Sequence, residues 1–197
     1  GDWEHGKPHG FGTATFGGGE SYTGDWAQGE PSGEGAYLYA NGNAYRGELE
    51  RRLRHGSGRC TYAGGATYEG GWANDLWHSA ADGGARTSLY HSDEGHRFEG
   101  PFVNGQLRGR GLVYYRHGDK YAGELDGFER HGEGTCTYGV GGGTYEGQWT
   151  RDRREGVGRL ESRAGESYEG EWLADRPHGT GTRVGADGSR EEGQFGW

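Results

Sequence analysis

Residues 168–172 read Tyr-Glu-Gly-Glu-Trp, and residues 176–181 read Arg-Pro-His-Gly-Thr-Gly. In the first stretch the tyrosine, the glycine and the tryptophan alternate with two glutamates. Such a two-residue period predicts a β-strand with one buried face. In the second stretch, Gly179 and Gly181 fall on one face of another strand, and the short polar segment between the stretches favours a turn. Together they predict a β-hairpin with one half that carries rings and one half that carries glycines.

The first stretch recurs along the whole chain of 197 residues. Its first residue returns at steps of 23 or 24 residues, with one step of 30. A glycine follows two residues later in every case, and a large apolar residue follows two residues after that. We therefore expect one repeat array over residues 1–197, with seven full repeats and a partial repeat at each end. The repeats start near residues 1, 22, 45, 68, 98, 121, 145, 168 and 191, and each is named below by its first residue.

The composition indicates how such hairpins would be stabilised. The chain holds 46 glycines, 7 Trp, 13 Tyr and 6 Phe, but few aliphatic residues. This composition excludes a Leu/Ile/Val core, a helical bundle and a coiled coil, and no apolar run approaches the ~18 residues of a membrane span. Because a single hairpin is marginal in water, we expect the rings of one hairpin to settle against the glycines of adjoining hairpins. The predicted fold is all-β, an elongated single-layer antiparallel sheet or solenoid of stacked hairpins.

These stretches resemble the MORN repeat (membrane occupation and recognition nexus), whose motif residues 168–172 and 176–181 match almost letter for letter. The resemblance implies a non-catalytic structural scaffold that binds partner proteins in cytoskeletal assemblies of cilia, flagella or the cell cortex, and hence a cytoplasmic location. Some proteins of this family dimerise or hold the tail of a partner, so the resemblance leaves a homodimer and a bound partner segment open. Similar arrays are attached to enzymes, including lipid kinases and a lysine methyltransferase, so a targeting array of a larger enzyme stays open as an alternative.

The charge pattern bears on nucleic acid and membrane partners. A formal charge of −9 argues against broad adhesion to nucleic acid or to an anionic bilayer. Recognition of phosphoinositides, which the family name suggests, needs a basic face. The hairpin turns look rich in arginine, but the turn segments hold 11 Lys or Arg and 11 Asp or Glu. We therefore expect no nucleic acid partner, and we rank membrane lipid below a protein partner.

The large apolar residues of the repeats are the candidate partner-binding residues. They predict an aromatic-lined groove that would accept a helical or extended segment of a partner, or a second copy of this chain in a homodimer. A tryptophan on an exposed loop is also typical of an interface anchor. The candidates are Trp26, Trp72, Trp77, Phe102, Trp149 and Trp172.

The Tyr68 repeat carries seven extra residues, which makes it the irregular member of the array. Matching Gly84–Tyr90 to Gly56–Tyr62 places about five of them in the hairpin turn, near Ser79–Gly83. The other two would lie in the return turn near Asp93–Gly95.

Trp77 would lie in this enlarged turn. Other repeats place Arg54, Arg130 or Pro177 at the same distance from their first residue. Two interpretations stay open: the Trp77 side chain folds back over its own loop, or it contacts a partner or bends the array.

Motifs for catalysis, cofactors and metals are missing from the sequence. Gly-x-Gly pairs such as Gly109-Arg-Gly111 lack the strand and helix that a nucleotide-binding loop needs. His78, His91 and His96 share the irregular repeat with acidic neighbours, but nothing in their spacing makes three ligands converge. We expect no enzyme activity, no cofactor and no metal site. The recurrent His-Gly pair, as in His178-Gly179, is expected to close the hairpin turn.

The two cysteines, Cys60 and Cys136, occupy the same place in repeats that lie three apart. We estimate their separation at roughly 29 Å, far beyond the limit for a disulfide, so we interpret them as small buried apolar residues. The glutamates Glu146, Glu169 and Glu171 alternate with buried positions, and we expect them on a solvated face.

The two ends of the sequence are irregular. The chain has no Met and opens at Gly1-Asp2-Trp3, which we interpret as the start of a fragment or a trimmed product. Glu191 stands where the other repeats have tyrosine or phenylalanine, so we expect the last repeat to be a cap or a junction.

Overall fold

Antiparallel β-strands form the described part of the chain. The computed structural model describes residues 1–79 and 88–196, and within them it contains no α-helix and one short 3-10 helix, Gly17–Gly19. The expected all-β fold of stacked hairpins is confirmed. The chain divides into two compact units: Gly1–Gly95 with Pro101–Gln106, and His96–Gly100 with Leu107–Trp197.

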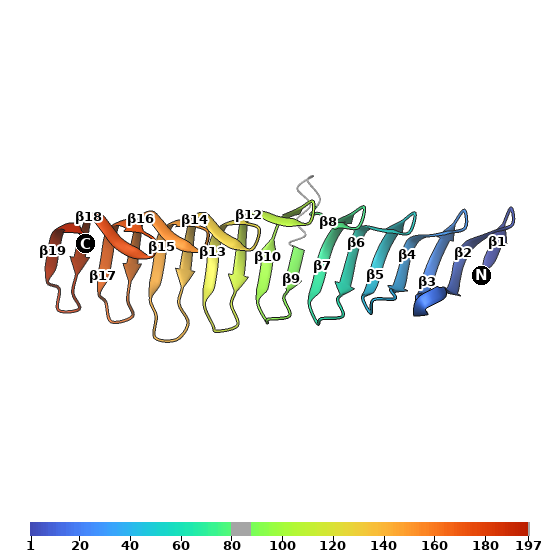
Figure 1. Cartoon of the computed structure of the whole chain (residues 1–197), viewed down its shortest axis with the longest axis horizontal. Coiled ribbons are helices and arrows are strands. Elements are labelled where there is room, and N and C mark those ends of the chain that lie inside the picture. Colours follow the sequence, from blue (N-terminus) through green and yellow to red (C-terminus); the bar gives the residue numbers. More distant parts are fainter. Residues whose placement is uncertain (80–87, 197) are drawn as a thin grey trace. The chain divides into compact units, whose positions relative to one another are not determined.

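The strands of the first unit succeed one another along the chain (Figure 1). They are β1 (Asp2–Glu4), β2 (Lys7–Thr15), β3 (Ser21–Ala27), β4 (Glu30–Leu38), β5 (Ala44–Glu50), β6 (Leu53–Thr61), β7 (Thr67–Ala73), β8 (Leu76–Trp77), β9 (Ser88–His91) and β11 (Phe102–Val103).

The second unit repeats this order. Its strands are β10 (Arg97–Gly100), β12 (Gln106–Tyr114), β13 (Lys120–Asp126), β14 (Glu129–Thr137), β15 (Thr144–Thr150), β16 (Arg153–Glu161), β17 (Ser167–Leu173), β18 (Arg176–Val184) and β19 (Arg190–Phe195).

The repeating element is a hairpin of a short strand and a long strand, as in β15 and β16. Their turn residues Arg151 and Asp152 both have positive φ, 48° and 66°. Two such residues form the tight turn whose twist matches that of paired strands. The long strand β16 pairs with its own short strand β15 and also with the next one, β17. Each long strand therefore joins two successive repeats through backbone hydrogen bonds.

The tyrosine that opens a repeat packs over glycines of the same repeat. A Cβ atom on Gly170 would lie 2.5 Å from Cα of Gly181 and 2.7 Å from Oη of Tyr168. The Tyr168 hydroxyl donates a hydrogen bond to the carbonyl oxygen of Glu171, at 3.0 Å. The expectation that rings fill glycine gaps of adjoining repeats is therefore wrong for these tyrosines, because the ring reaches across its own hairpin.

The tryptophan two residues after the first glycine makes the contact between repeats. Trp172 donates its indole N–H to the carbonyl oxygen of Gly158 in the preceding repeat, at 2.9 Å. Its ring meets Tyr145 of that repeat edge-on, with centroids 5.2 Å apart. Trp26, Trp72 and Trp149 each donate the same bond to the preceding repeat. The stack is therefore held by contacts between nearest neighbours.

The His-Gly pair lies in the middle of the long strand. Gly179 lies within β18 and has φ +56°, and the strand register shifts opposite this segment, between Gly170 and Glu171. The expectation that His178-Gly179 closes the turn is wrong. Glycine is favoured here by the left-handed φ. A Cβ would also lie 2.6 Å from the Glu171 carboxylate, which accepts a hydrogen bond from the backbone N–H of Thr180 at 2.9 Å. Glu171 is exposed as expected, but it also fixes this β-bulge.

The hairpin turn of the Tyr68 repeat has the normal length. Asn74 and Asp75 form a two-residue turn with φ 49° and 68°, and Trp77 in β8 pairs with Trp72 in β7. On β9, Tyr90 pairs with Tyr68. The expectation that Trp77 lies in an enlarged hairpin turn is therefore wrong.

Tyr90 pairs with Tyr68 as Cys60 pairs with Tyr45 in the preceding repeat. Cys60 follows Tyr45 by 15 residues and Tyr90 follows Tyr68 by 22, so all seven extra residues lie before Tyr90. The return turn closes through a bond from Gly95 N to Ser92 O, as Gly65 N bonds Tyr62 O one repeat earlier. The two extra residues expected near Asp93–Gly95 are therefore absent. Of the insertion expected near Ser79–Gly83, all but Ser79 lies outside the described residues.

The two cysteines are buried and free, as expected. Sγ of Cys60 lies 3.7 Å from Nη1 of Arg54, and Sγ of Cys136 lies 3.7 Å from Nη1 of Arg130. Burial raises the pKa of both thiols, which keeps them protonated at neutral pH.

Candidate functional site

The tryptophans predicted to line a groove form the core of each unit. Trp72 and Trp172 are 3% exposed and Trp149 is 2% exposed. Trp26 is 8% exposed and Phe102 is fully buried. Little of these rings reaches the surface, so contact between them and a partner stays a prediction.

Trp77 is half-buried and packs within the first unit. Its ring stacks on Tyr68, with centroids 4.6 Å apart and planes 7° apart, and meets Phe102 edge-on at 5.3 Å. Its indole N–H donates a hydrogen bond to the hydroxyl of Tyr62, at 2.8 Å. Of the two interpretations, the structure shows packing on neighbouring strands of its own unit, and an additional role in docking stays a prediction.

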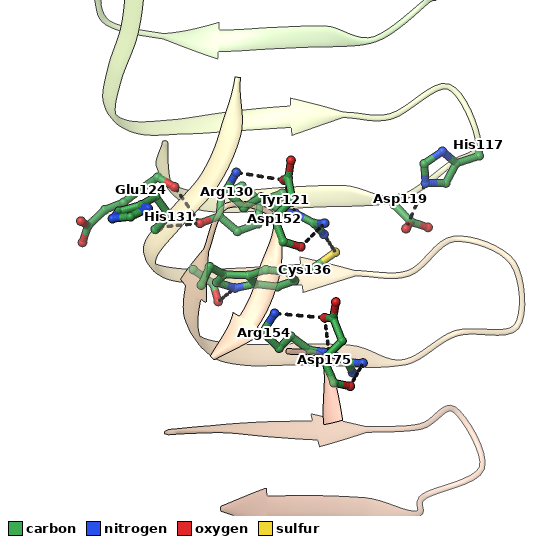
Figure 2. A network of polar contacts seen from close by, with 12 residues as sticks. His117, Asp119, Tyr121, Glu124, Arg130, His131, Cys136, Asp152, Arg154 and Asp175 are labelled. Carbon is green, nitrogen blue, oxygen red and sulfur yellow. Dashed lines mark hydrogen bonds and ion pairs between the residues drawn. The ribbon is translucent and has the colours of Figure 1, made fainter. Parts of the chain in front are cut away.

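Arginines at the place of Trp77 in other repeats form ion pairs between repeats. Nε of Arg130 lies 2.8 Å from Oδ1 of Asp152, and its Nη2 donates to the Asp152 carbonyl at 2.8 Å (Figure 2). The Asp152 carboxylate also accepts the backbone N–H of Arg130, at 3.0 Å. We call this arrangement the Arg–Asp clamp. It occurs as Arg54 with Asp75, Arg130 with Asp152 and Arg154 with Asp175.

Each clamp arginine also covers a core tryptophan. The guanidinium carbon lies 4.2–4.4 Å from the ring centroid of Trp72, Trp149 or Trp172. All three arginine side chains are only 18% exposed. From the sequence these residues were interpreted as turn charges, and the clamp was not predicted. The available signal was an aspartate 21 or 22 residues after each of these arginines.

Arg130→Lys is expected to lower the free energy of unfolding by about 1–2 kcal/mol, because lysine cannot donate to Asp152 at two points and stack on Trp149. The midpoint of urea unfolding measures the loss. Arg108→Lys is the matched control, since Nε of Arg108 lies 4.0 Å from Asp126 and the side chain is 61% exposed. The control should stay within about 0.5 kcal/mol of wild type. Equal losses in the two variants would contradict a structural role of the clamp.

Half-buried rings follow the long strands, at one recurrent place just before the return turn. We call them the aromatic row. It comprises Phe16, Tyr39 and Tyr62 in the first unit and Tyr115 and Tyr138 in the second. The hydroxyls of Tyr39 and Tyr115 are buried and have no hydrogen-bond partner among the described residues. Burial raises the pKa of each of the four tyrosines, and to about 12 for Tyr39, Tyr115 and Tyr138.

Alkaline pH is expected to unfold the chain cooperatively. Burial disfavours the phenolate, so the folded pKa of Tyr115 lies at about 12, above its ordinary value of 10.0. The stability that this shift contributes is complete below pH 10 and is lost as the pH rises through about 12. Absorbance at 295 nm, which follows phenolate formation, should rise together with the loss of the β circular dichroism signal. Independent titration of all tyrosines near pH 10, with the fold intact, would contradict this burial.

The aromatic row is interrupted at Ser92 in the Tyr68 repeat and again in the last two full repeats. Ser162 and Gly185 stand where the row has rings in earlier repeats, and a cavity of about 390 Å³ lies beside them. Trp172, Pro177, Arg183 and Arg154 also line it.

A cluster of metal-ligating side chains and a membrane-spanning helix are both absent from the described residues. Residues 1–79 and 88–196 contain no group of three His, Cys, Asp or Glu side chains placed to hold a metal ion. His91 lies on β9, and Nδ1 of His96 accepts the backbone N–H of Arg116 at 3.1 Å. Over the same residues, no helix has the length and apolar character needed to cross a bilayer.

Comparison with protein families gives one clear match. The family model described as MORN repeat matches residues 1–21, 22–44, 45–67, 68–79, 129–143, 145–167 and 168–190, which is more than half of the chain. Residues 98–128 are not matched, although β10, β12 and β13 continue the hairpin pattern there. No curated protein matches the chain.

Two solved structures share weak similarity with the chain. The TCP domain of Drosophila Melanogaster SAS-4 (dCPAP), in complex with a Proline Rich Motif of Ana2 (dSTIL), is 13% identical, with a TM-score of 0.48 over 83% of this chain and 85% of that one. The wild-type TCP10 domain of Danio rerio CPAP is 12% identical, with a TM-score of 0.29 over 92% of this chain and 93% of that one. At these identities and TM-scores, neither similarity bears on the function of this chain.

Proposed function

Because the chain belongs to the MORN-repeat family, we propose that it is a non-catalytic interaction scaffold that binds a segment of a partner protein. The observation that carries this proposal is the aromatic row. Half-buried rings recur at one place in three successive hairpins of the first unit and in two of the second, so a helical or extended partner segment can contact several of them in turn.

The arrangement of charges favours a protein partner over a lipid surface. The clamp arginines Arg54, Arg130 and Arg154 are paired with aspartates and covered by core contacts. Their charges are therefore neutralised within the chain, and a phosphoinositide headgroup would have to displace a carboxylate to reach them. A cytoplasmic setting in a cytoskeletal, ciliary, flagellar or cortical assembly is part of the proposal, and so is a possible second copy of this chain as the partner.

Affinity capture followed by binding measurements with the purified partner tests the proposal. Tyr39→Ser removes one ring of the aromatic row, and Leu38→Ser is the matched control, since Leu38 is the neighbouring residue and is 45% exposed. We expect at least about tenfold weaker binding for Tyr39→Ser and unchanged binding for Leu38→Ser. Thermal melts establish that both variants are folded.

Two results would overturn this function. The first is equal binding by both variants and wild type, which would remove the aromatic row as the contact surface. The second is strong, salt-sensitive co-sedimentation with phosphoinositide vesicles, without capture of any protein, which would favour the membrane alternative. Light scattering of the purified chain tests the homodimer.

A further inference from the structure

The cavity beside Ser162 lies where the repeat pattern would place a ring of the aromatic row. In the preceding repeat this place belongs to Tyr138, and burial raises the pKa of its hydroxyl to about 12. In the Tyr145 repeat it belongs to Ser162, and the next repeat has Gly185. Because serine and glycine are far smaller than a phenol ring, the surface stays hollow there, with a volume of about 390 Å³.

The first unit shows how the equivalent place is filled. Phe16 lies six residues before Tyr22, as Ser162 lies six residues before Tyr168, so the two residues are equivalent. Pro31 likewise has the place in its repeat that Pro177 has at the cavity. The Phe16 ring stacks on Tyr37, with centroids 6.1 Å apart and planes 9° apart. It also approaches Trp26, at 6.4 Å. The residues equivalent to Tyr37 and Trp26 at the cavity are Arg183 and Trp172, and both line it.

Arg183 gives the cavity a planar cation in place of the Tyr37 ring. Its guanidinium carbon lies 5.6 Å from the ring centroid of Phe195, and within the described residues it forms no ion pair. A guanidinium stacks well on aromatic faces and holds them more strongly than aliphatic groups. The lining of the cavity therefore combines Trp172, Pro177 and the Arg183 guanidinium with the carboxylates of Glu166 and Asp175.

We propose that this cavity binds an aromatic side chain carried by a partner protein segment, with the ring between Arg183 and Trp172. The ring takes the place that Phe16 has in the first unit and completes the aromatic row from outside. This inference rests on the proposed function, because it assigns one anchor of the partner to one place on the scaffold.

Titration with N-acetyl-tyrosinamide, followed by 15N-edited NMR, tests the chemistry of the cavity without a known partner. We expect saturable shifts at Ser162, Val184 and the Trp172 indole N–H. N-acetyl-leucinamide, the aliphatic probe, should bind several-fold more weakly. Arg183→Ala should weaken binding of the aromatic probe about fivefold. Equal binding of the two probes, or shifts scattered over the chain, would overturn the proposal.

Ser162→Tyr fills the cavity from within and should abolish probe binding. Arg163→Tyr is the matched control, since it places the same ring on the neighbouring exposed residue, and it should leave binding unchanged. A thermal melt at or above that of wild type shows that Ser162→Tyr is folded, and Arg183→Ala gives an independent test if it is not. Retained probe binding in a folded Ser162→Tyr chain would overturn the proposal.

The same variants separate this inference from the proposed function. If the scaffold function is wrong, the wild-type chain captures no partner protein. If only the cavity assignment is wrong, wild type and Ser162→Tyr bind the captured partner equally well. If both are right, Ser162→Tyr binds the purified partner at least about tenfold more weakly than Arg163→Tyr.

Discussion

Gly170→Ala is expected to lower the free energy of unfolding by about 3 kcal/mol, as overpacking a tightly filled site does. The added Cβ would lie 2.5 Å from Cα of Gly181, 2.6 Å from the Thr180 carbonyl oxygen and 2.7 Å from the Tyr168 hydroxyl. Two of these atoms belong to the backbone of the paired strand, so the overlap is relieved only by separating β17 from β18. Urea unfolding, followed by circular dichroism, measures the loss.

Gly193→Ala is the matched control within the same unit. Gly193 has the same place in its repeat as Gly170, but Glu191 stands where the tyrosine would be, and no atom lies within 4 Å of its added Cβ. We expect a change of no more than about 0.5 kcal/mol. A similar loss in both variants would show that glycine is needed for backbone conformation alone, and not to make room for the ring.

Trp172→Ala is expected to cost about 3–5 kcal/mol, the usual range for removing a buried tryptophan. The ring is 3% exposed and meets Tyr145 and Tyr168 edge-on, each at 5.2 Å. The substitution also leaves the Gly158 carbonyl without its indole partner and uncovers the Arg154 guanidinium. The shift in urea midpoint, with the slope checked for two-state behaviour, measures this cost.

Trp3→Ala is the control for Trp172→Ala. Trp3 occupies the same place in its repeat but is 69% exposed, so we expect a change below about 0.5 kcal/mol. Trp172→Phe separates the ring from its hydrogen bond and should cost about 1 kcal/mol through the lost bond. If the two alanine variants lose the same stability, burial between repeats is not what gives Trp172 its effect.

Much of the fold follows from the spacing of residues in the sequence. The alternation of residues 168–172 predicts the short strand, and the recurrence of that stretch predicts the stack. The spacing could not show that Tyr168 packs over Gly170 and Gly181 of its own repeat. Equivalent residues of neighbouring repeats have the same phase, so a periodic sequence does not distinguish a contact within a repeat from one between repeats. The β-bulge at Gly179 was not predicted, because glycine is typical of turns as well as of bulges and the His-Gly pair lies near a turn.

The candidate site was harder to predict than the fold. Alternation places Trp72 and Trp172 on an apolar face, but a core and an open groove produce the same pattern. The Arg–Asp clamp joins residues of successive repeats. A count of charges in the turn segments balances the clamp arginines against the aspartates and does not show that they form pairs. The cavity was visible in the sequence only as the missing ring at Ser162 and Gly185. That absence becomes meaningful once Phe16 and Pro31 show how the equivalent place is filled.

Hydrogen exchange of the indole N–H groups tests most directly whether each repeat is bound to the preceding one through its tryptophan. The indoles of Trp26, Trp72, Trp149 and Trp172 donate to glycine carbonyls at 2.9–3.1 Å, whereas Trp3 is 69% exposed. We predict that these four indole signals persist in deuterated water long after the Trp3 signal has disappeared. Exchange of all five at the rate of a free indole would contradict the account.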